Sequence, residues 1–209
     1  MKNQQKKFDP SLYFILNLPS IQPPFQLAQK AIQGGVTTIQ LRGKNSDAAS
    51  LYALAVELKP YLDAHHVTLI INDRLDVALA AQADGVHLGK NDLPLIQSRL
   101  LAPDLIIGVS CYGDLKRAQY ATKHHADYIA FGAFFPSPTK PNAPQIPLSI
   151  LQEASTLQVP IIAIGGITPP RASQLIQNGA DGVAIISAIQ EASDPQKAAQ
   201  NFIHHIKIS

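Results

Sequence analysis

Residues 71–92 read INDRLDVALAAQADGVHLGKND and hold the unit from which the fold can be inferred. Two short apolar runs, Val67–Ile71 and Val86–Leu88, are typical of buried strands, and the apolar segment between them is long enough for a short helix. A polar cluster follows each run, with Asp73 after the first and Asp92 after the second. If the two strands are parallel neighbours, both aspartates emerge at one edge of the sheet, where paired carboxylates suit a divalent cation.

The composition excludes several classes of protein. The chain has 209 residues, of which 46% are hydrophobic and 15% charged, and this argues against disorder and fits one domain. Its 17 Lys+Arg against 15 Asp+Glu are too balanced to suggest a nucleic-acid or membrane partner. No apolar run approaches the ~18 residues of a membrane span. The single cysteine, Cys111, excludes an internal disulfide and fits a reducing cytoplasm.

Residues 1–11 are predicted to be an N-terminal extension of one domain that fills the rest of the chain. The start, MKNQQKKFDP, is polar and basic, and an apolar stretch, SLYFILNLP, follows it. That stretch is short, contains Asn17 and has no small-residue cleavage site after it. We therefore interpret it as a strand rather than as part of a signal peptide.

Short apolar runs alternate with helix-like segments along the whole chain. Runs of four to six residues without strict polar alternation are expected of parallel strands that are covered on both faces. The segments between them, such as 48–58, 115–124 and 172–178, carry apolar residues at helical spacing. This order predicts a parallel sheet with right-handed crossovers. The predicted strands are Leu12–Leu16, Thr38–Leu41, Val67–Ile71, Gly85–Leu88, Leu105–Val109, Tyr128–Phe131, Pro160–Ile164 and Gly182–Ile186.

A weak internal repeat favours a closed barrel over an open sheet. An Ala-Asp pair opens the fourth, sixth and eighth predicted strands, with the aspartates at Asp84, Asp127 and Asp181. In a closed barrel of about eight strands, alternate strands supply matching layers, which explains such a repeat. We therefore predict a (β/α)8 TIM barrel. The three aspartates begin strands, at the face associated with stability, so we expect structural roles for them.

Polar residues follow most predicted strands, at the face where barrels place their chemistry. Gln40, Arg42 and Lys44 alternate after the second strand, and period-two spacing puts Gln40 and Arg42 on one face. Two cations at a barrel mouth need an anion, which can be a ligand phosphate. An internal ion pair with an aspartate would explain Arg42 alone about as well. Ser110 ends the fifth strand, where it can equally cap a helix.

The last loops point to phosphate binding. The proline-rich loop after the sixth strand holds Ser137, Thr139 and Lys140, and a lysine between hydroxyls suits a pyrophosphate. After the seventh strand come Gly165 and Gly166, which permit close approach of a ligand to the backbone, and then Thr168-Pro169, a predicted helix start. The eighth strand ends in Ile186 and Ser187, so that these two loops form the phosphate site that recurs in such barrels.

Some of these residues have a structural alternative. Asp73 and Asp92 could each cap the helix that follows, although together, beside so many cations, metal binding explains them better. Cys111 has no base next to it in the sequence and alternation turns it away from the centre, so we expect packing rather than a nucleophile. We interpret His87, inside the fourth strand, as a hydrogen-bonded structural residue rather than a base.

The assembled motifs resemble the thiamine-phosphate synthase family. The matching segments follow the family's order over most of the chain. They are QLRGK at 40–44, INDRLDVALAAQADGVHLGKND at 71–92, IGVS at 107–110, DYIAFGAFFPSPTK at 127–140, AIGGI at 163–167 and GADGVAIISAI at 179–189.

The resemblance implies a transferase that joins hydroxymethylpyrimidine pyrophosphate to thiazole phosphate and releases pyrophosphate, through a pyrimidine carbocation. It implies Mg2+ at Asp73 and Asp92 as the cofactor, and small molecules as the only partners, with a homo-oligomer left open. The implied pyrophosphate contacts are Arg42, Lys44, Asn72, Lys140 and Ser110, of which Ser110 and Lys140 are expected to be catalytic. Gln40 would orient the pyrimidine, and the implied thiazole phosphate contacts are Ser137, Thr139, Gly166, Ile186 and Ser187.

Two residues depart from the family's pattern. Ser137 stands where threonine is common, which keeps the hydroxyl, and Tyr112 stands where many relatives carry histidine. The sister family of thiazole tautomerases resembles the chain too, but it uses a histidine near that place. The remaining alternatives are another phosphate-binding barrel isomerase and a non-catalytic phosphate-sensing barrel. Retention of QLRGK and PSPTK favours the synthase.

Overall fold

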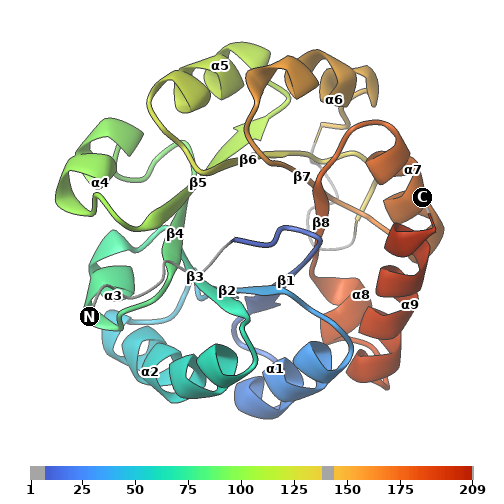
Figure 1. Ribbon diagram of the computed structural model, residues 1–209. Coiled ribbons are helices and arrows are strands. Elements are labelled where there is room, and N and C mark those ends of the chain that lie inside the picture. The colour runs from blue at the N-terminus through green and yellow to red at the C-terminus, as the bar shows by residue number, and fades with distance from the viewer. Residues whose placement is uncertain (1–7, 138–143, 209) are drawn as a thin grey trace.

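Eight parallel strands close into a barrel in chain order, from β1 next to β2 through to β8 next to β1 (Figure 1). The structure is a computed structural model, and it describes residues 8–137 and 144–208. The predicted (β/α)8 barrel is therefore confirmed. The strands are β1 Leu12–Asn17, β2 Thr38–Arg42, β3 Thr68–Asn72, β4 Gly85–Leu88, β5 Ile106–Tyr112, β6 Tyr128–Phe131, β7 Ile161–Ile164 and β8 Gly182–Ile185.

Each predicted strand exists, and most bounds agree within a residue. The largest difference is in β5, which continues three residues beyond the predicted end at Val109 to Tyr112. The register with β6 shifts between Ser110 and Tyr112, an irregularity of the kind a β-bulge produces. A bulge re-aims the residues after it, and strict alternation of the sequence does not predict it.

The helices cover the outside of the barrel. Helix α2 is longer than its predicted core of 48–58, the short helix expected between β3 and β4 is α3, and α7 begins directly after Thr168, as the Thr-Pro pair predicts. No helix among the described residues is long and apolar enough to cross a membrane. The helices are α1 Pro24–Gln33, α2 Ala48–Ala64, α3 Leu75–Ala80, α4 Leu95–Leu101, α5 Leu115–Lys123, α6 Ser149–Ala154, the 3-10 turn η1 Ser155–Leu157, α7 Pro169–Gln177, α8 Ser187–Gln190 and α9 Pro195–Lys207.

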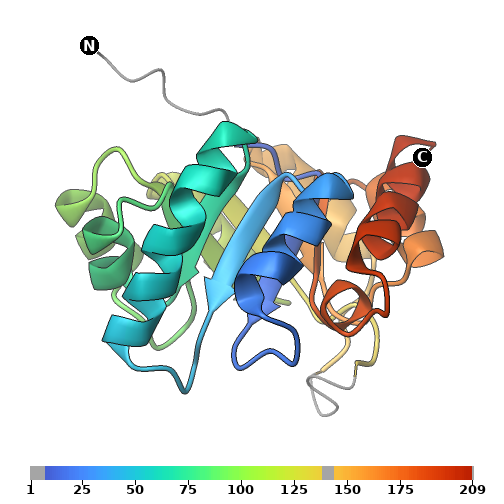
Figure 2. The ribbon, with the colours of Figure 1, turned by 90° about the horizontal axis from the view of Figure 1, so that it is seen from below.

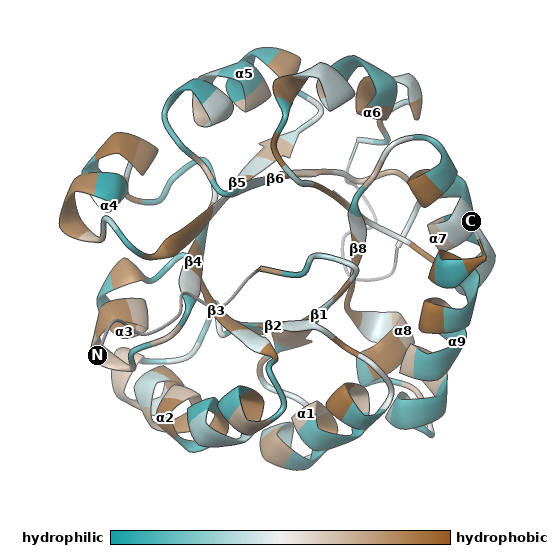
Figure 3. Ribbon diagram, viewed as in Figure 1, coloured by the Kyte–Doolittle hydropathy of each residue, from teal (hydrophilic) through white to brown (hydrophobic). Residues whose placement is uncertain are grey.

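Apolar side chains fill two separate layers. One layer lies between the barrel and its helices, and the strands and the helix sides that face them carry most of the hydrophobic residues (Figure 3). The other fills the barrel interior, where Tyr13, Ile70, Ile106 and Tyr128 belong to one cluster. Gly108 makes room there, because a Cβ at that position would lie 1.9 Å from the Tyr128 ring. The tyrosine therefore occupies space that any other residue at 108 would take.

The three repeated aspartates join neighbouring strands at the N-terminal end of the barrel. The carboxylates of Asp84, Asp127 and Asp181 accept the backbone N–H of a residue at the start of β3, β5 and β7, the first or second of the strand, over 2.7, 2.7 and 2.8 Å. Each bond gives a backbone N–H near the start of a strand an acceptor at the entry to the neighbouring strand. The structural role expected of the three aspartates is confirmed. They recur before every second strand because each one, at the start of an even-numbered strand, bonds the odd-numbered strand before it.

The described part of the N-terminal extension lies at the end of the barrel opposite the strand C-termini (Figure 2). Phe8 stacks on Tyr128 with ring centroids 4.8 Å apart. The Asp9 carbonyl accepts hydrogen bonds from the hydroxyls of Thr38, which begins β2, and of Thr37 just before it. These contacts tie the segment across the N-terminal mouth, so the interior is reached from the other end.

Replacing Asp181 with alanine is expected to destabilise the fold by about 1 kcal/mol, because the Ile161 N–H loses its acceptor. For a domain of this size the melting temperature should fall by roughly 2–4 °C, measured by calorimetry. Glu153→Ala, on the exposed side of α6, is the matched control and should leave the melting temperature unchanged. A variant of Asp181 as stable as the wild type would contradict the assigned role.

Candidate active site

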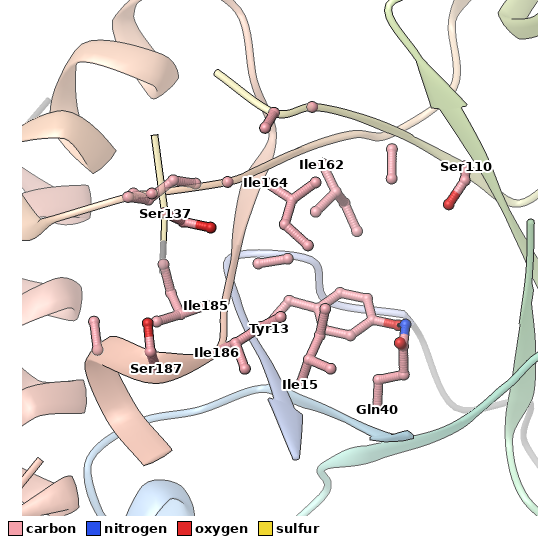
Figure 4. Close-up of a pocket in the computed structure, with 18 of the residues that line it drawn as sticks. Tyr13, Ile15, Gln40, Ser110, Ser137, Ile162, Ile164, Ile185, Ile186 and Ser187 are labelled. Atoms are coloured by element: carbon pink, nitrogen blue, oxygen red, sulfur yellow. Dashed lines mark hydrogen bonds between the residues drawn. The ribbon is translucent and has the colours of Figure 1, made fainter. Parts of the chain in front are cut away.

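A cavity of about 730 Å³ opens at the C-terminal ends of the strands, a size that suits a small-molecule site. Polar side chains occupy both of its ends and isoleucines separate them. In Figure 4, Gln40 and Ser110 lie at one end, Ser137 and Ser187 at the other, and Ile164 lies between. The cavity can therefore hold two polar groups of one ligand, or of two ligands, on either side of an apolar wall.

Strand β2 places two of its predicted side chains at the cavity. Gln40 and Arg42 both line it, so the predicted shared face is confirmed. Arg42 is partly buried and donates a hydrogen bond to the Asn17 side chain at the end of β1. Lys44, beyond the strand, is more exposed, and its Nζ lies 3.8 Å from the Asp73 carboxylate. Asn72 ends β3 and lines the cavity beside them.

Asp73 and Asp92 meet at this rim, as the opening stretch of sequence predicts. Strands β3 and β4 are parallel neighbours, and the carboxyl groups of Asp73 and Asp92 interact with each other. Burial first, and then the hydrogen bond and the charge of Asp92, raise the pKa of the Asp73 carboxyl. Lys44 and Arg42 oppose this shift of the pKa. The pair therefore holds negative charge at a cost that a bound cation would relieve.

The alternative that these aspartates cap helices is wrong. The residue before α3 is Arg74 and the residue before α4 is Pro94, and neither helix start has a side-chain cap. Asp73 has a left-handed backbone with φ of 63°, and its N–H donates to the carbonyl of His87 on the next strand. Asp92 instead accepts the N–H of Gly89 over 2.6 Å. Helix capping therefore explains neither side chain.

The donor set fits Mg2+ shared with a ligand. Within the described ranges no group of three or more His, Cys, Asp or Glu side chains is placed to hold a metal. Mg2+ typically takes one or two carboxylates from the protein, and substrate phosphates and water complete its octahedron. Two carboxylates beside Arg42 and Lys44, which would hold the phosphates, match that pattern rather than that of an all-protein metal site.

The other end of the cavity is built from the loops after β6, β7 and β8. Ser137, Gly166, Ile186 and Ser187 all line it. Gly166 has φ of 59°, and a Cβ there would lie 2.2 Å from the carbonyl oxygen of Pro136, so only glycine lets these loops touch. The backbone N–H groups at the start of α8 have no partner inside the helix, as at any helix start.

The predicted site residues Thr139 and Lys140 lie outside the described residues. Other residues that line the cavity were not predicted from the sequence. Arg171 was missed: it lines the cavity, donates to the Gly166 carbonyl over 2.7 Å and lies over the Phe135 ring. Its place in the first turn of α7, just after the Gly-Gly loop, was the available signal. Tyr13 and Tyr128 also line the cavity and were missed, because each lies in an apolar run that looks like ordinary core.

Ser110, Cys111 and Tyr112 at the end of β5 have three different environments. Ser110 lines the cavity, and Cys111 packs between the barrel and the helices, fully buried. Burial raises the pKa of the Cys111 thiol to about 12, so it is no nucleophile at neutral pH. Tyr112, turned by its positive φ of 57°, lines the cavity rim and accepts the Lys90 N–H. The expected packing role of Cys111 is confirmed.

A buried chain of polar side chains lies beneath the Gln40–Ser110 end. It includes His87, whose two ring nitrogens lie within 3.0 Å of the Tyr128 hydroxyl and 2.8 Å of the Ser110 hydroxyl. The expectation that His87 is hydrogen-bonded is confirmed. Tyr13 continues the chain from Tyr128 to Gln40.

Comparison with known proteins identifies the family. The family described as thiamine monophosphate synthase matches residues 12–189. A thiamine-phosphate synthase of Methanobrevibacter smithii is 39% identical over 95% of this chain and 96% of its own length, and one of Methanospirillum hungatei is 46% identical over 85% and 87%. The structure of a thiamine phosphate pyrophosphorylase from Pyrococcus furiosus superposes with a TM-score of 0.89 at 35% identity, covering 96% of both chains.

Replacing Asp73 with asparagine is expected to raise the stability of the metal-free protein. The raised pKa means that ionised Asp73 costs stability as the pH rises through that pKa, so a neutral amide should melt higher at pH 7. Asparagine also tolerates the left-handed backbone of this position. We expect a gain of roughly 1–3 °C by calorimetry in EDTA, and loss of any stabilisation by Mg2+.

Asp76→Asn on α3 is the matched control. Arg74 lowers the pKa of Asp76, so this aspartate adds stability above its unfolded pKa, and its amide variant should melt at the same temperature or slightly lower. If Asp73→Asn melts at a lower temperature than the wild type in EDTA, the carboxylates of Asp73 and Asp92 do not repel each other in the way proposed.

Proposed function

The chain belongs to the thiamine monophosphate synthase family, and we propose that its barrel mouth joins hydroxymethylpyrimidine pyrophosphate to thiazole phosphate. The products are thiamine phosphate and pyrophosphate, which makes the protein a transferase of thiamine biosynthesis. The observation that carries the proposal is the rim itself. Asp73 and Asp92 interact with each other beside Arg42 and Lys44, and Arg42 lines one end of a cavity whose other end is also polar.

The leaving pyrophosphate would lie at the rim of β2, β3 and β4. Arg42, Lys44 and Asn72 come from adjacent strand ends and could neutralise or donate to its oxygens. Lys140, from the loop after β6, would complete the clamp. Charge neutralisation on the leaving group lowers the barrier to breaking the C–O bond, because the developing negative charge meets positions that are already positive.

Asp73 and Asp92 would hold Mg2+ against this pyrophosphate. When bound, the ion would neutralise charge on the phosphate oxygens. The role of the protein is to present the two carboxylates at one point. Repulsion between the carboxylates disfavours the ionised pair when no cation is present.

The pyrimidine would lie deeper, over Gln40 and Ser110. Gln40 would orient the ring, and Ser110 would contact the departing group or assist proton movement. Loss of pyrophosphate leaves a carbocation that the thiazole nitrogen attacks, forming the C–N bond without a covalent enzyme intermediate. The wall of Ile162 and Ile164 offers no nucleophile to intercept that cation, and Cys111 is buried outside the cavity.

The thiazole phosphate would occupy the opposite end. Ser137 and Ser187 supply hydroxyls, and the amides of Gly166, Ile186 and Ser187 could donate to its oxygens. Thr139 would add a contact from the same loop as Ser137. Arg171 fixes the Gly166 loop through its carbonyl and adds positive charge near the phosphate.

The rival functions from the sequence have less support. Thiazole tautomerase is disfavoured because Tyr112, and not a histidine, lines the rim at that place. A phosphate-sensing barrel without catalysis gains nothing from two carboxylates held in contact. We further propose a cytoplasmic enzyme that acts on small molecules, and oligomerisation does not enter the proposed chemistry.

The direct test is an assay of the purified protein with both phosphorylated substrates and Mg2+. We expect thiamine phosphate and one equivalent of pyrophosphate, with little product in EDTA, because the unneutralised leaving group departs slowly. Chromatography of the mixture measures both products.

Single-substrate incubations and heat-inactivated protein are the controls, and an established synthase run in parallel validates the substrates. Absence of product where that enzyme works would remove the proposal. Isomerisation of a thiazole substrate without the pyrimidine would instead point to the tautomerase.

A further inference from the structure

Five side chains from four strands form one unbroken hydrogen-bonded chain in the barrel interior. Gln40 Nε2 donates to the Tyr13 hydroxyl over 2.8 Å, and the Tyr13 and Tyr128 hydroxyls are 2.8 Å apart. The Tyr128 hydroxyl lies 3.0 Å from His87 Nδ1, and His87 Nε2 lies 2.8 Å from the Ser110 hydroxyl. Both ends of the chain, Gln40 and Ser110, face the cavity (Figure 4).

The direction of these bonds follows from the Gln40 end. The Gln40 amide nitrogen is a donor only, so the proton of the buried Tyr13 hydroxyl must go to Tyr128. The Tyr128 proton must then go to His87 Nδ1. Burial raises the pKa of both phenols, so both keep their protons at neutral pH. A neutral imidazole that accepts at Nδ1 carries its hydrogen on Nε2, which therefore donates to Ser110.

We propose that His87 is a positioning residue, fixed as one tautomer by Tyr128, which orients the Ser110 hydroxyl so that its proton points into the cavity. With His87 donating to its oxygen, the hydroxyl of Ser110 is left to donate to an acceptor there. The inference rests on the proposed function for the identity of that acceptor, an oxygen of the departing pyrophosphate or the pyrimidine. It goes beyond that function by assigning a role to Tyr13, Tyr128 and His87, which the proposed reaction does not otherwise use.

The packing around His87 and Tyr128 holds both rings in place. Their centroids are 5.6 Å apart in a stacked arrangement, and Phe8 stacks on the other side of Tyr128 at 4.8 Å. Tyr13 and Tyr128 are 1% and 0% exposed, so no solvent competes for their hydrogen bonds. Gly108 leaves the volume that the Tyr128 ring fills.

The arrangement also separates positioning from base catalysis. Both ring nitrogens of His87 have partners on the protein, so neither is offered to the substrate. Of the two bonded partners, Ser110 is the one whose hydroxyl lies at the Gln40–Ser110 end of the cavity, so the proposed effect of His87 on the reaction passes through Ser110. Loss of one such bond is expected to cost about 10-fold in turnover, the size of one hydrogen bond.

Nuclear magnetic resonance reads the tautomer without any turnover. In protein labelled with 15N-histidine, two-bond 1H–15N correlations distinguish a protonated Nε2 from a protonated Nδ1, and His87→Gln identifies the signals by their loss. We expect His87 as the neutral Nε2–H form in the wild type. Tyr128→Phe should abolish this single form, since Nδ1 loses its donor. His66→Asn, at an exposed turn, should leave the His87 signals unchanged.

Kinetics then tests the route through Ser110. His87→Gln extends an amide toward the place of Nε2 and should retain most of the turnover, whereas His87→Asn reaches only Tyr128. We expect kcat of His87→Asn to fall about 10-fold with little change in the KM for thiazole phosphate. Combined with Ser110→Ala it should be no slower than Ser110→Ala alone. Circular dichroism verifies that each variant is folded. If His87→Asn is not folded, Tyr128→Phe replaces it in the kinetic test, because this variant removes only a hydroxyl.

An Nδ1–H or doubly protonated His87 in the wild type would overturn the proposal, because Ser110 would then donate to the ring. Additive effects of His87→Asn and Ser110→Ala would overturn it as well. Failure of the proposed function is distinguishable: the wild type would form no thiamine phosphate, while the tautomer would still decide the direction of the Ser110 hydroxyl.

Discussion

Closure of the parallel barrel is the constraint on which the site depends. Because all eight strands run in one direction, every strand ends at the same rim, and the register of β3 against β4 brings Asn72 opposite His87. Asp73 and Asp92, which follow β3 and β4, are thereby brought together. The opposite rim is sealed differently, by aspartates that bond the neighbouring strand and by Phe8 on Tyr128. One end of the barrel is thus built for stability and the other for charge.

The carboxylate pair shows the conflict between stability and function. Burial and the charge of Asp92 raise the pKa of Asp73, so the ionised site opposes folding slightly when no cation is present. Neither aspartate caps the helix that follows it, so helix capping does not explain why both are present. Arg42 and Lys44 offset only part of the repulsion. A site that costs stability when empty and is relieved by Mg2+ with a phosphate ligand fits the leaving-group chemistry proposed for it.

The sequence predicts those features that depend on residues close together along the chain, and it misses those that depend on contacts between distant segments. Strand positions, the Asp84 repeat and the alternation of Gln40 with Arg42 are local patterns, and the structure agrees with each. The register shift near Tyr112 and the contact of Arg171 with the Gly166 loop depend on tertiary packing, which no local pattern reports. The buried chain is the clearest case, because Tyr13 and Tyr128 lie 115 residues apart and each looks like an ordinary core aromatic in its own strand. The roles assigned to Thr139 and Lys140 still rest on the motif alone.

Calorimetric titration of pyrophosphate into the wild-type protein addresses the carboxylate rim most directly. With Mg2+ present, pyrophosphate should bind, and without the ion it should bind at least 10-fold more weakly, because two carboxylates then face its charge unneutralised. In Asp73→Asn the difference between the two conditions should shrink, since one carboxylate is gone. Equal affinity of the wild type for pyrophosphate with and without Mg2+ would contradict the view that Asp73 and Asp92 meet in order to share a cation with the leaving group.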